Sequence, residues 1–225
     1  MGAVLAWPVE RAANDAVLDV GAQVSGLDGL LDGRRLWKGR TPHTGPSAHP
    51  TGVDALDAAL PGGGWPASAL SEILHADDGV GEMRLAWPAL ARLSQAGERV
   101  VLIAPPYRPF APAWRAAGIA LERLHVVSAS NARDALWAAE QCLRSGSCGA
   151  VLCWPQRVDD RALRRLQVAA ESGQTLALAW RDMAAARNPS PAALRVAIDT
   201  APSALRVIKC RGGMPPTRPI AFTAP

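Results

Sequence analysis

Residues 50–85 read PTGVDALDAALPGGGWPASALSEILHADDGVGEMRL, and this stretch decides the fold. It contains an alternating segment at 70–75 that predicts a strand, then a turn with Gly79 and Gly81, and then the start of a predicted helix at Glu82. Strand, glycine-containing turn and helix form the arrangement in which backbone N–H groups bind a nucleotide phosphate. The stretch therefore predicts an α/β protein built around this turn.

The residues that would bind a nucleotide are missing from this turn. A Walker A loop continues from its last glycine into a lysine, which neutralises the phosphates, and a serine or threonine, which ligates Mg²⁺. Here Glu82 and Met83 follow Gly81. A carboxylate repels a triphosphate, and a thioether is a poor ligand for a hard cation. We therefore interpret Gly79, Gly81, Glu82 and Met83 as a degenerate P-loop, and we expect no cofactor.

The strand predicted at 149–154, with the sequence GAVLCW, stands where a nucleotide-hydrolysing protein would carry its Walker B motif. That motif needs an aspartate at the end of the strand, which holds Mg²⁺. Trp154 and Pro155 stand there instead. Two independent nucleotide elements are therefore degenerate, and we expect no enzymatic activity. An ATPase with an unusual loop is an alternative that Glu82 and Met83 oppose.

The remainder of the chain alternates apolar strands with amphipathic helices. Helices are predicted at 82–96, 111–118, 131–145 and 159–172, and strands at 70–75, 99–104, 124–128, 149–154 and 175–180. A hairpin and an edge strand follow, at 193–199, 204–210 and 218–223. Pro88 should kink the first helix or delay its start. This pattern suits a RecA-like core, in which helices flank a mostly parallel, twisted sheet with antiparallel strands at its C-terminal end.

The composition divides the chain into three regions. Residues 1–48 are predicted to be a partly ordered arm and linker, 49–214 a RecA-like domain with degenerate Walker A and Walker B elements, and 215–225 a C-terminal tail. Within the arm, the apolar spacing between Ala12 and Leu31 favours a helix. Two interpretations of the arm stay open: a partly ordered tail, and an arm that folds when it docks on a partner.

Positive charge gathers in the last third of the chain. The formal net charge is +4, but from Ala150 onward eleven Lys and Arg stand against five acidic residues. Such a region permits contact with nucleic acid or with an acidic partner, and a solvated, arginine-rich face is the alternative. The candidate contacts with a partner or with DNA are Arg161, Arg164, Arg165, Lys209 and Arg211.

The remaining composition excludes several classes of protein. The chain has 225 residues and is 49% hydrophobic, which is enough for one well-buried domain. Most aromatic residues are tryptophans, which we expect in the core, with a tryptophan-rich partner surface as the alternative. The four cysteines have no zinc-ligand spacing, so we expect reduced thiols and no metal. The N-terminus has no signal-peptide pattern, and no apolar run reaches membrane-spanning length, so we expect a cytoplasmic protein.

Further stretches, together with TGVDALDAALPGGGWP and SEILHADDGVGE, give the chain a family resemblance. They are LWKG at 36–39, VLIAPPY at 101–107, ALWAAEQ at 135–141, LRRLQVAAE at 163–171, SPAALR at 190–195 and KCRGG at 209–213. In order and spacing they resemble ImuA, the RecA-like accessory protein of bacterial translesion DNA synthesis. The resemblance runs from about Leu36 to Gly213.

The resemblance to ImuA implies a non-catalytic adaptor of damage-inducible, error-prone DNA synthesis in the SOS response, which acts through protein contacts. It implies as partners the Y-family-like polymerase homologue ImuB and a damage-inducible DnaE-type polymerase, with RecA and the sliding clamp reached indirectly. Direct DNA contact is a further expectation, and no membrane contact is expected. Leu36 and Trp37 are candidates for a partner-binding arm.

A cell-division inhibitor resembling SulA is the alternative from a different class. Such a protein also lacks ATPase motifs, and it sequesters the division GTPase. The LWKG segment, the PGGGWP loop and the LRRLQVAAE helix favour ImuA over this alternative.

Overall fold

The computed structural model describes residues 47–200 and 203–222. These residues all belong to one compact unit. The predictions made for the arm, including the helix between Ala12 and Leu31 and the docking residues Leu36 and Trp37, lie outside the described residues.

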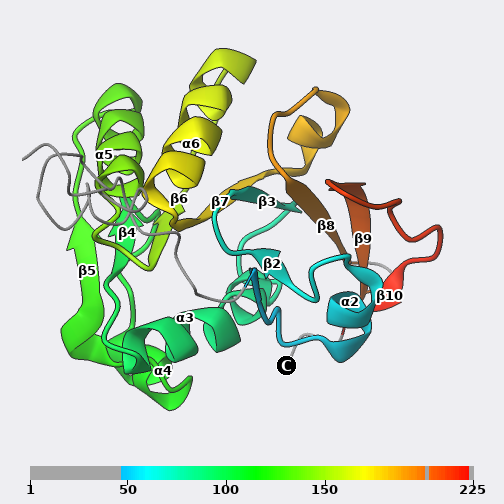
Figure 1. The fold of residues 1–225 in the computed structure, drawn as a ribbon, viewed down its shortest axis with the longest axis horizontal. Coiled ribbons are helices and arrows are strands. Elements are labelled where there is room, and N and C mark those ends of the chain that lie inside the picture. The colour runs from blue at the N-terminus through cyan, green and yellow to red at the C-terminus, as the bar shows by residue number, and fades with distance from the viewer. Residues whose placement is uncertain (1–46, 201–202, 223–225) are drawn as a thin grey trace, which may run out of the picture. The chain divides into compact units, whose positions relative to one another are not determined.

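One eight-stranded sheet organises the described chain, in the order β10-β9-β8-β3-β7-β6-β4-β5 (Figure 1). Its strands are β3 (Leu70–His75), β4 (Val100–Ile103), β5 (Leu124–Val127), β6 (Ala150–Cys153), β7 (Leu176–Asp182), β8 (Leu194–Thr200), β9 (Ser203–Cys210) and β10 (Ile220–Ala221). The pairings from β8 through β5 are parallel, whereas β9 pairs antiparallel with β8 and with β10. The predicted mixed α/β fold, with a mostly parallel sheet and antiparallel strands at the C-terminal end, is confirmed.

Helices cover both faces of this sheet. They are α2 (Asp54–Ala59), α3 (Trp87–Gln95), α4 (Ala111–Ala116), α5 (Ala132–Ser145) and α6 (Asp160–Gly173), with the short 3₁₀ helices η1 (Glu82–Leu85), η2 (Leu121–Arg123) and η3 (Met183–Arg187). α5 and α6 lie together on one face, and α3 and α4 lie on the other (Figure 1). A separate two-stranded ribbon pairs β1 (Ala48–His49) with β2 (Trp65–Pro66).

The continuous apolar runs of the central strands follow from burial on both faces. In β4, Val100 and Leu102 pack toward α3 and α4, while Val101 and Ile103 pack toward α5 and α6. Successive side chains of a strand point to opposite faces, so a strand covered on both sides needs apolar residues at every position. This burial explains the unbroken apolar run VVLI in the strand predicted at 99–104.

The helix starts agree with the capping residues in the sequence. Asn131 accepts the backbone N–H of Asp134 at 2.9 Å, and Asp159 accepts that of Ala162 at 2.8 Å, as an N-cap should. Pro88 lies in the first turn of α3, so the helix begins at Trp87 and only the 3₁₀ turn η1 stands where the first part of the helix was predicted.

Helix α2 starts without a side-chain cap, and Val53 is its N-cap residue. Thr51 instead accepts the N–H of Val53 at 3.2 Å, ahead of the helix, while its own N–H donates to the carboxylate of Asp57 at 3.0 Å. Neither Thr51 nor Asp54 therefore satisfies a helical N–H group. The carboxylate of Asp57, inside α2, thus holds the backbone of Thr51 just ahead of the helix.

The glycines of the PGGGWP loop have a structural explanation at Gly64. A Cβ at this position would lie 2.0 Å from the carbonyl oxygen of His49, and φ is 152°. The close approach lets the ribbon strands pair and carries Trp65 into the core, where its indole N–H donates to the carbonyl of Leu85 at 2.7 Å. The loop is thus a packing requirement of this fold.

A buried carboxylate joins three strands of the sheet. Glu72 in β3 is fully buried and accepts from Nη1 of Arg181 in β7 at 2.9 Å and from Nε of Arg195 in β8 at 2.5 Å. The hydroxyl of Ser190 donates to the same carboxylate at 3.0 Å. The sequence pattern of 70–75 gave no warning of this cluster, because its partners lie more than 100 residues away in the chain.

Candidate functional site

The glycine turn after β3 is occupied by a side chain of its own chain. Gly79 and Gly81 have φ of 82° and 87°, the left-handed region that glycine favours. The N–H of Gly79 donates to Oε1 of Glu82 at 3.3 Å, so a carboxylate takes a backbone donor that a phosphate would use. Met83 packs against the core. The structure thus brings together the four residues predicted as a degenerate P-loop.

Trp154 fills the corresponding end of β6. Its ring stacks on Trp180 of β7, with centroids 5.2 Å apart and an interplanar angle of 18°. The preceding thiol, Cys153, is buried, and this burial raises its pKa to about 12. Aromatic packing therefore stands where a nucleotide-hydrolysing protein of the predicted fold would carry a Walker B aspartate. Within residues 47–200 and 203–222, no group of three His, Cys, Asp or Glu side chains could hold a metal ion.

The loop after β4 joins this end of the sheet. The hydroxyl of Tyr107 donates to Oδ2 of Asp78 at 3.0 Å, which ties the loop to the glycine turn. This hydrogen bond, with the negative charge of Asp78, raises the pKa of Tyr107 above its ordinary value of 10.0. Asp78 also lies 3.7 Å from Nδ1 of His75.

Apolar side chains project into solvent around the same loop. Tyr107 is 68% exposed, Phe110 69% and Val126, on the edge strand β5, 50%. Tyr107 and Val126 line a hollow of about 790 Å³ between the proline-rich loop and β5, and Phe110 follows in the same loop. We call Tyr107, Phe110, Val126 and this hollow the aromatic loop surface. Exposed aromatic clusters of this kind mark sites of protein contact.

Backbone geometry holds the aromatic loop surface in place. Ala104 takes a φ of 45° as the chain leaves β4, while its N–H still donates to the carbonyl of Val127 at 2.8 Å. Three prolines then restrict the loop, and α4 follows at Ala111 with Trp114 buried as its anchor. A rigid surface loses little conformational entropy when it binds, so exposed side chains on it can contribute fully to affinity.

The basic residues predicted as partner or DNA contacts gather around α6, but most of them already have partners. Arg164 lies 3.5 Å from Asp160, Arg165 pairs with Glu140, and Arg211 lies 2.7 Å from Glu171. Nζ of Lys209 donates to the carbonyl of Ser190 at 2.6 Å, and burial lowers the pKa of Lys209. Arg161 is exposed on α6. Which partner these residues contact stays untested.

Sequence reasoning missed a second surface on the α5 side. Trp137 is 61% exposed there, whereas Trp65 and Trp180 are fully buried and Trp114 nearly so. The expectation of core filling therefore holds for those three, and the alternative of a partner surface fits Trp137. The sequence contains little sign that Trp137 is exposed. It lies among alanines in α5, and the pattern also allows it to face the core.

The described residues define a mixed α/β protein with a self-occupied glycine turn and an exposed, rigid aromatic loop. Residues 68–177 match the family model of the cell division inhibitor SulA. The crystal structure of SulA from Pseudomonas aeruginosa is 31% identical in sequence; the match covers 51% of this chain and 98% of that chain, with a TM-score of 0.44. By this identity over nearly the whole relative, the chain belongs to the SulA family. No curated protein matches the chain.

The resemblance to ImuA is therefore wrong, and with it the predicted role in translesion synthesis and the partners ImuB, the DnaE-type polymerase, RecA and the sliding clamp. The helical stretch LRRLQVAAE, which favoured ImuA, lies inside the residues that match SulA. The PGGGWP loop lies outside them, and the contact of Gly64 with His49 explains it as a packing feature. LWKG lies outside both the match and the described residues.

No helix among the described residues is long and apolar enough to cross a membrane.

Proposed function

We propose that this protein inhibits cell division by binding the division GTPase FtsZ through its aromatic loop surface. Membership of a family described as a cell division inhibitor supports the partner. The observation that carries the choice of surface is the pair of aromatic side chains, Tyr107 and Phe110, each more than two-thirds exposed within the family-matched residues.

The energetics of protein interfaces favour this surface. A few aromatic and arginine side chains near the centre of an interface supply most of its binding energy. Arg108 stands between Tyr107 and Phe110 in the chain, and Arg115 in α4 and Arg123 in η2 are also exposed. None of these three arginines has an ion-pair partner in the described part of the chain. The surface therefore suits a partner patch with an apolar centre and an acidic rim.

The protein inhibits by staying bound to FtsZ and covering a contact surface, and it does so without enzymatic turnover. The carboxylate of Glu82 on the N–H of Gly79 and the stacking of Trp154 on Trp180 support the absence of ATPase activity. Inhibition by occupancy requires stoichiometric amounts of inhibitor. We therefore expect one bound molecule to block one contact between FtsZ subunits, in the cytoplasm where those polymers form.

We infer in addition that the sheet is a RecA-like core. In its support, β3 leads into the glycine turn and a helix, while Trp154 directly follows β6, where a RecA-like protein would carry its Walker B acid. β7 lies between these two strands.

Sedimentation of FtsZ polymers formed with GTP tests the proposed function. The wild-type protein should reduce the pelleted polymer at about one inhibitor per FtsZ subunit. The double variant Tyr107→Ala/Phe110→Ala should need at least about tenfold more protein, since truncated hot-spot aromatics each cost on the order of 2 kcal/mol. Trp137→Ala removes an equally exposed aromatic side chain elsewhere and should inhibit like the wild type. Undiminished polymer with saturating wild-type protein would contradict the proposal.

A further inference from the structure

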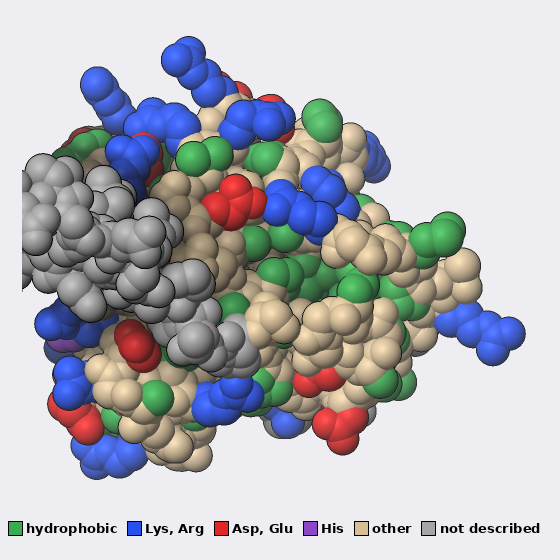
Figure 2. Space-filling view, in the orientation of Figure 1, with side chains coloured by type: hydrophobic (Ala, Val, Ile, Leu, Met, Phe, Trp, Pro, Cys, Tyr) green, Lys and Arg blue, Asp and Glu red, His purple; other side chains and the backbone are tan. Residues whose placement is uncertain are grey.

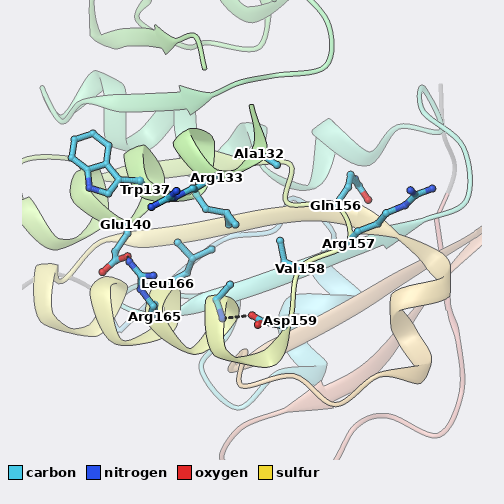
Figure 3. Close-up of a pocket in the computed structure, with 12 residues that line it drawn as sticks. Ala132, Arg133, Trp137, Glu140, Gln156, Arg157, Val158, Asp159, Arg165 and Leu166 are labelled. Carbon is cyan, nitrogen blue, oxygen red and sulfur yellow. Dashed lines mark hydrogen bonds and ion pairs between the residues drawn. The ribbon is translucent and has the colours of Figure 1, made fainter. Parts of the chain in front are cut away.

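A second hollow, of about 500 Å³, lies between α5, α6 and the loop that joins β6 to α6 (Figure 3). We call it the α5–α6 groove. Its floor is aliphatic, with Leu136 from α5, Val158 from the loop, and Ala162 and Leu166 from α6. The proposed FtsZ surface does not include any of these residues.

Trp137 and Arg157 lie at opposite ends of the groove (Figure 3). Arg133 stands one helical turn before Trp137, so both belong to the same side of α5. Arg157 has a φ of 50°, a left-handed conformation that is unfavourable for a residue with a side chain. An apolar floor with cations toward both ends suits an elongated occupant that carries carboxylates along its length.

The acidic side chains in the groove do not neutralise these cations. Glu140 is buried and accepts from Arg144 and from Arg165. Asp159 accepts the N–H of Ala162 as the N-cap of α6. Arg133 and Arg157 form no ion pair with another described residue. Lys and Arg side chains also crowd the surface over α5 and α6 (Figure 2), so the groove lies in a field of positive charge.

We propose that the α5–α6 groove binds an acidic amphipathic helix of a partner protein. Aliphatic side chains of that helix pack on Leu136 and Leu166 beside Trp137, and its carboxylates pair with Arg133 and Arg157. A trough between two helices is a natural place for a third helix, which lays its apolar face into it. Single-stranded nucleic acid fits less well, because successive bases need several aromatic side chains to stack on, and Trp137 is the one aromatic residue among the described residues that line this groove.

Fluorescence anisotropy with a designed peptide tests the groove. The probe is a fluorescein-labelled amphipathic peptide of about 18 residues, or about five helical turns, with leucines on one face and glutamates on the other. The full-length wild-type protein should bind it, and added salt should weaken the binding. Arg133→Glu/Arg157→Glu should weaken it at least about tenfold, because attraction becomes repulsion at both ends. Arg133→Lys/Arg157→Lys keeps the charge and should retain most of the affinity.

Two controls separate this proposal from the proposed function. Tyr107→Ala/Phe110→Ala should bind the peptide like the wild type, and Arg133→Glu/Arg157→Glu should still block FtsZ polymers. Circular dichroism and thermal unfolding check that each variant is folded, and Arg133→Ala/Arg157→Ala replaces the glutamate variant if that one unfolds.

Three kinds of result would overturn the groove proposal while leaving the FtsZ proposal intact. The first is the absence of peptide binding. The second is equal binding of a peptide with lysine in place of every glutamate, or equal binding by the charge-reversed variant. The third is an oligothymidylate strand that binds more tightly than the acidic peptide and loses affinity in the same arginine variants, which would assign the groove to nucleic acid.

Discussion

At the residue scale, the most informative positions are Glu82 and Trp154, because each stands where a nucleotide-binding protein would need a different residue type. Glu82 and Trp154 could be identified from the sequence as wrong for a nucleotide site, because the required residue types are known. The structure adds what they do instead: Glu82 accepts the N–H of Gly79, and Trp154 stacks on Trp180. Trp137 and Phe110 could not be identified this way, since exposure depends on which elements cover them.

Tyr107 offers a clean probe of the aromatic loop, because it is the single tyrosine of the chain. Its raised pKa comes first from the hydrogen bond to Asp78 and then from the charge of that carboxylate. Asp78→Asn should therefore bring the pKa of Tyr107 back toward 10.0 in an ultraviolet absorbance titration. Asp77→Asn removes a neighbouring carboxylate that accepts nothing from Tyr107, and it is the matched control.

The sign of the associated pH dependence follows from the direction of the shift. A tyrosine whose folded pKa is raised stabilises the loop contact fully below its unfolded pKa, and this contribution disappears as pH rises through the folded value. The contact between the two loops should thus persist at neutral pH and open only in alkali. Identical titration curves for wild type and Asp78→Asn would mean that the loop does not rest on the glycine turn.

At the scale of elements, local sequence was a good guide wherever local interactions decide the structure. The helices predicted to begin at 131 and 159 do start there, with Asn131 and Asp159 as the N-caps of α5 and α6, and apolar runs marked the strands covered on both faces. The family was misidentified because short matching stretches were weighted as signatures. One of them, around Gly64, meets a steric need of the β1–β2 ribbon, and such needs are not specific to a family.

The Glu72 cluster could not be predicted either, because it joins β3, β7 and β8 across more than 100 residues of chain. Replacing Glu72 with alanine leaves Arg181 and Arg195 buried without their anion. We expect a loss of about 3–5 kcal/mol in the free energy of unfolding, measured by urea denaturation.

The matched control for Glu72→Ala is Arg206→Ala, which breaks an ion pair with Asp199 at 2.9 Å on the half-exposed edge of the hairpin. Solvent screens that pair, so the loss should be about 1 kcal/mol or less. Comparable losses in the two variants would show that the buried cluster contributes no more than a surface pair, and that β8 is held to β3 by backbone pairing alone.

At the scale of the whole molecule, one part of the fold matches the SulA family model and the other part lies outside the match. Residues 68–177 contain β3, the glycine turn, the aromatic loop surface, α5 and α6, and they end within β7. The strands β8, β9 and β10 extend the sheet beyond β3, and the β1–β2 ribbon lies ahead of it in the chain. Both proposed binding surfaces lie inside the matched portion, and the Glu72 cluster attaches the added strands to it.

The central claim is that the protein stops division by binding FtsZ, and cell length after DNA damage in a strain that lacks the gene tests it most directly. Induced mutation frequency should be measured in the same cultures. We predict that damaged cells without the gene continue to divide and stay short, that plasmid-borne wild type restores filaments while Tyr107→Ala/Phe110→Ala does not, and that mutagenesis is unchanged. Normal filaments together with a collapse of induced mutagenesis in the deletion strain would contradict the account.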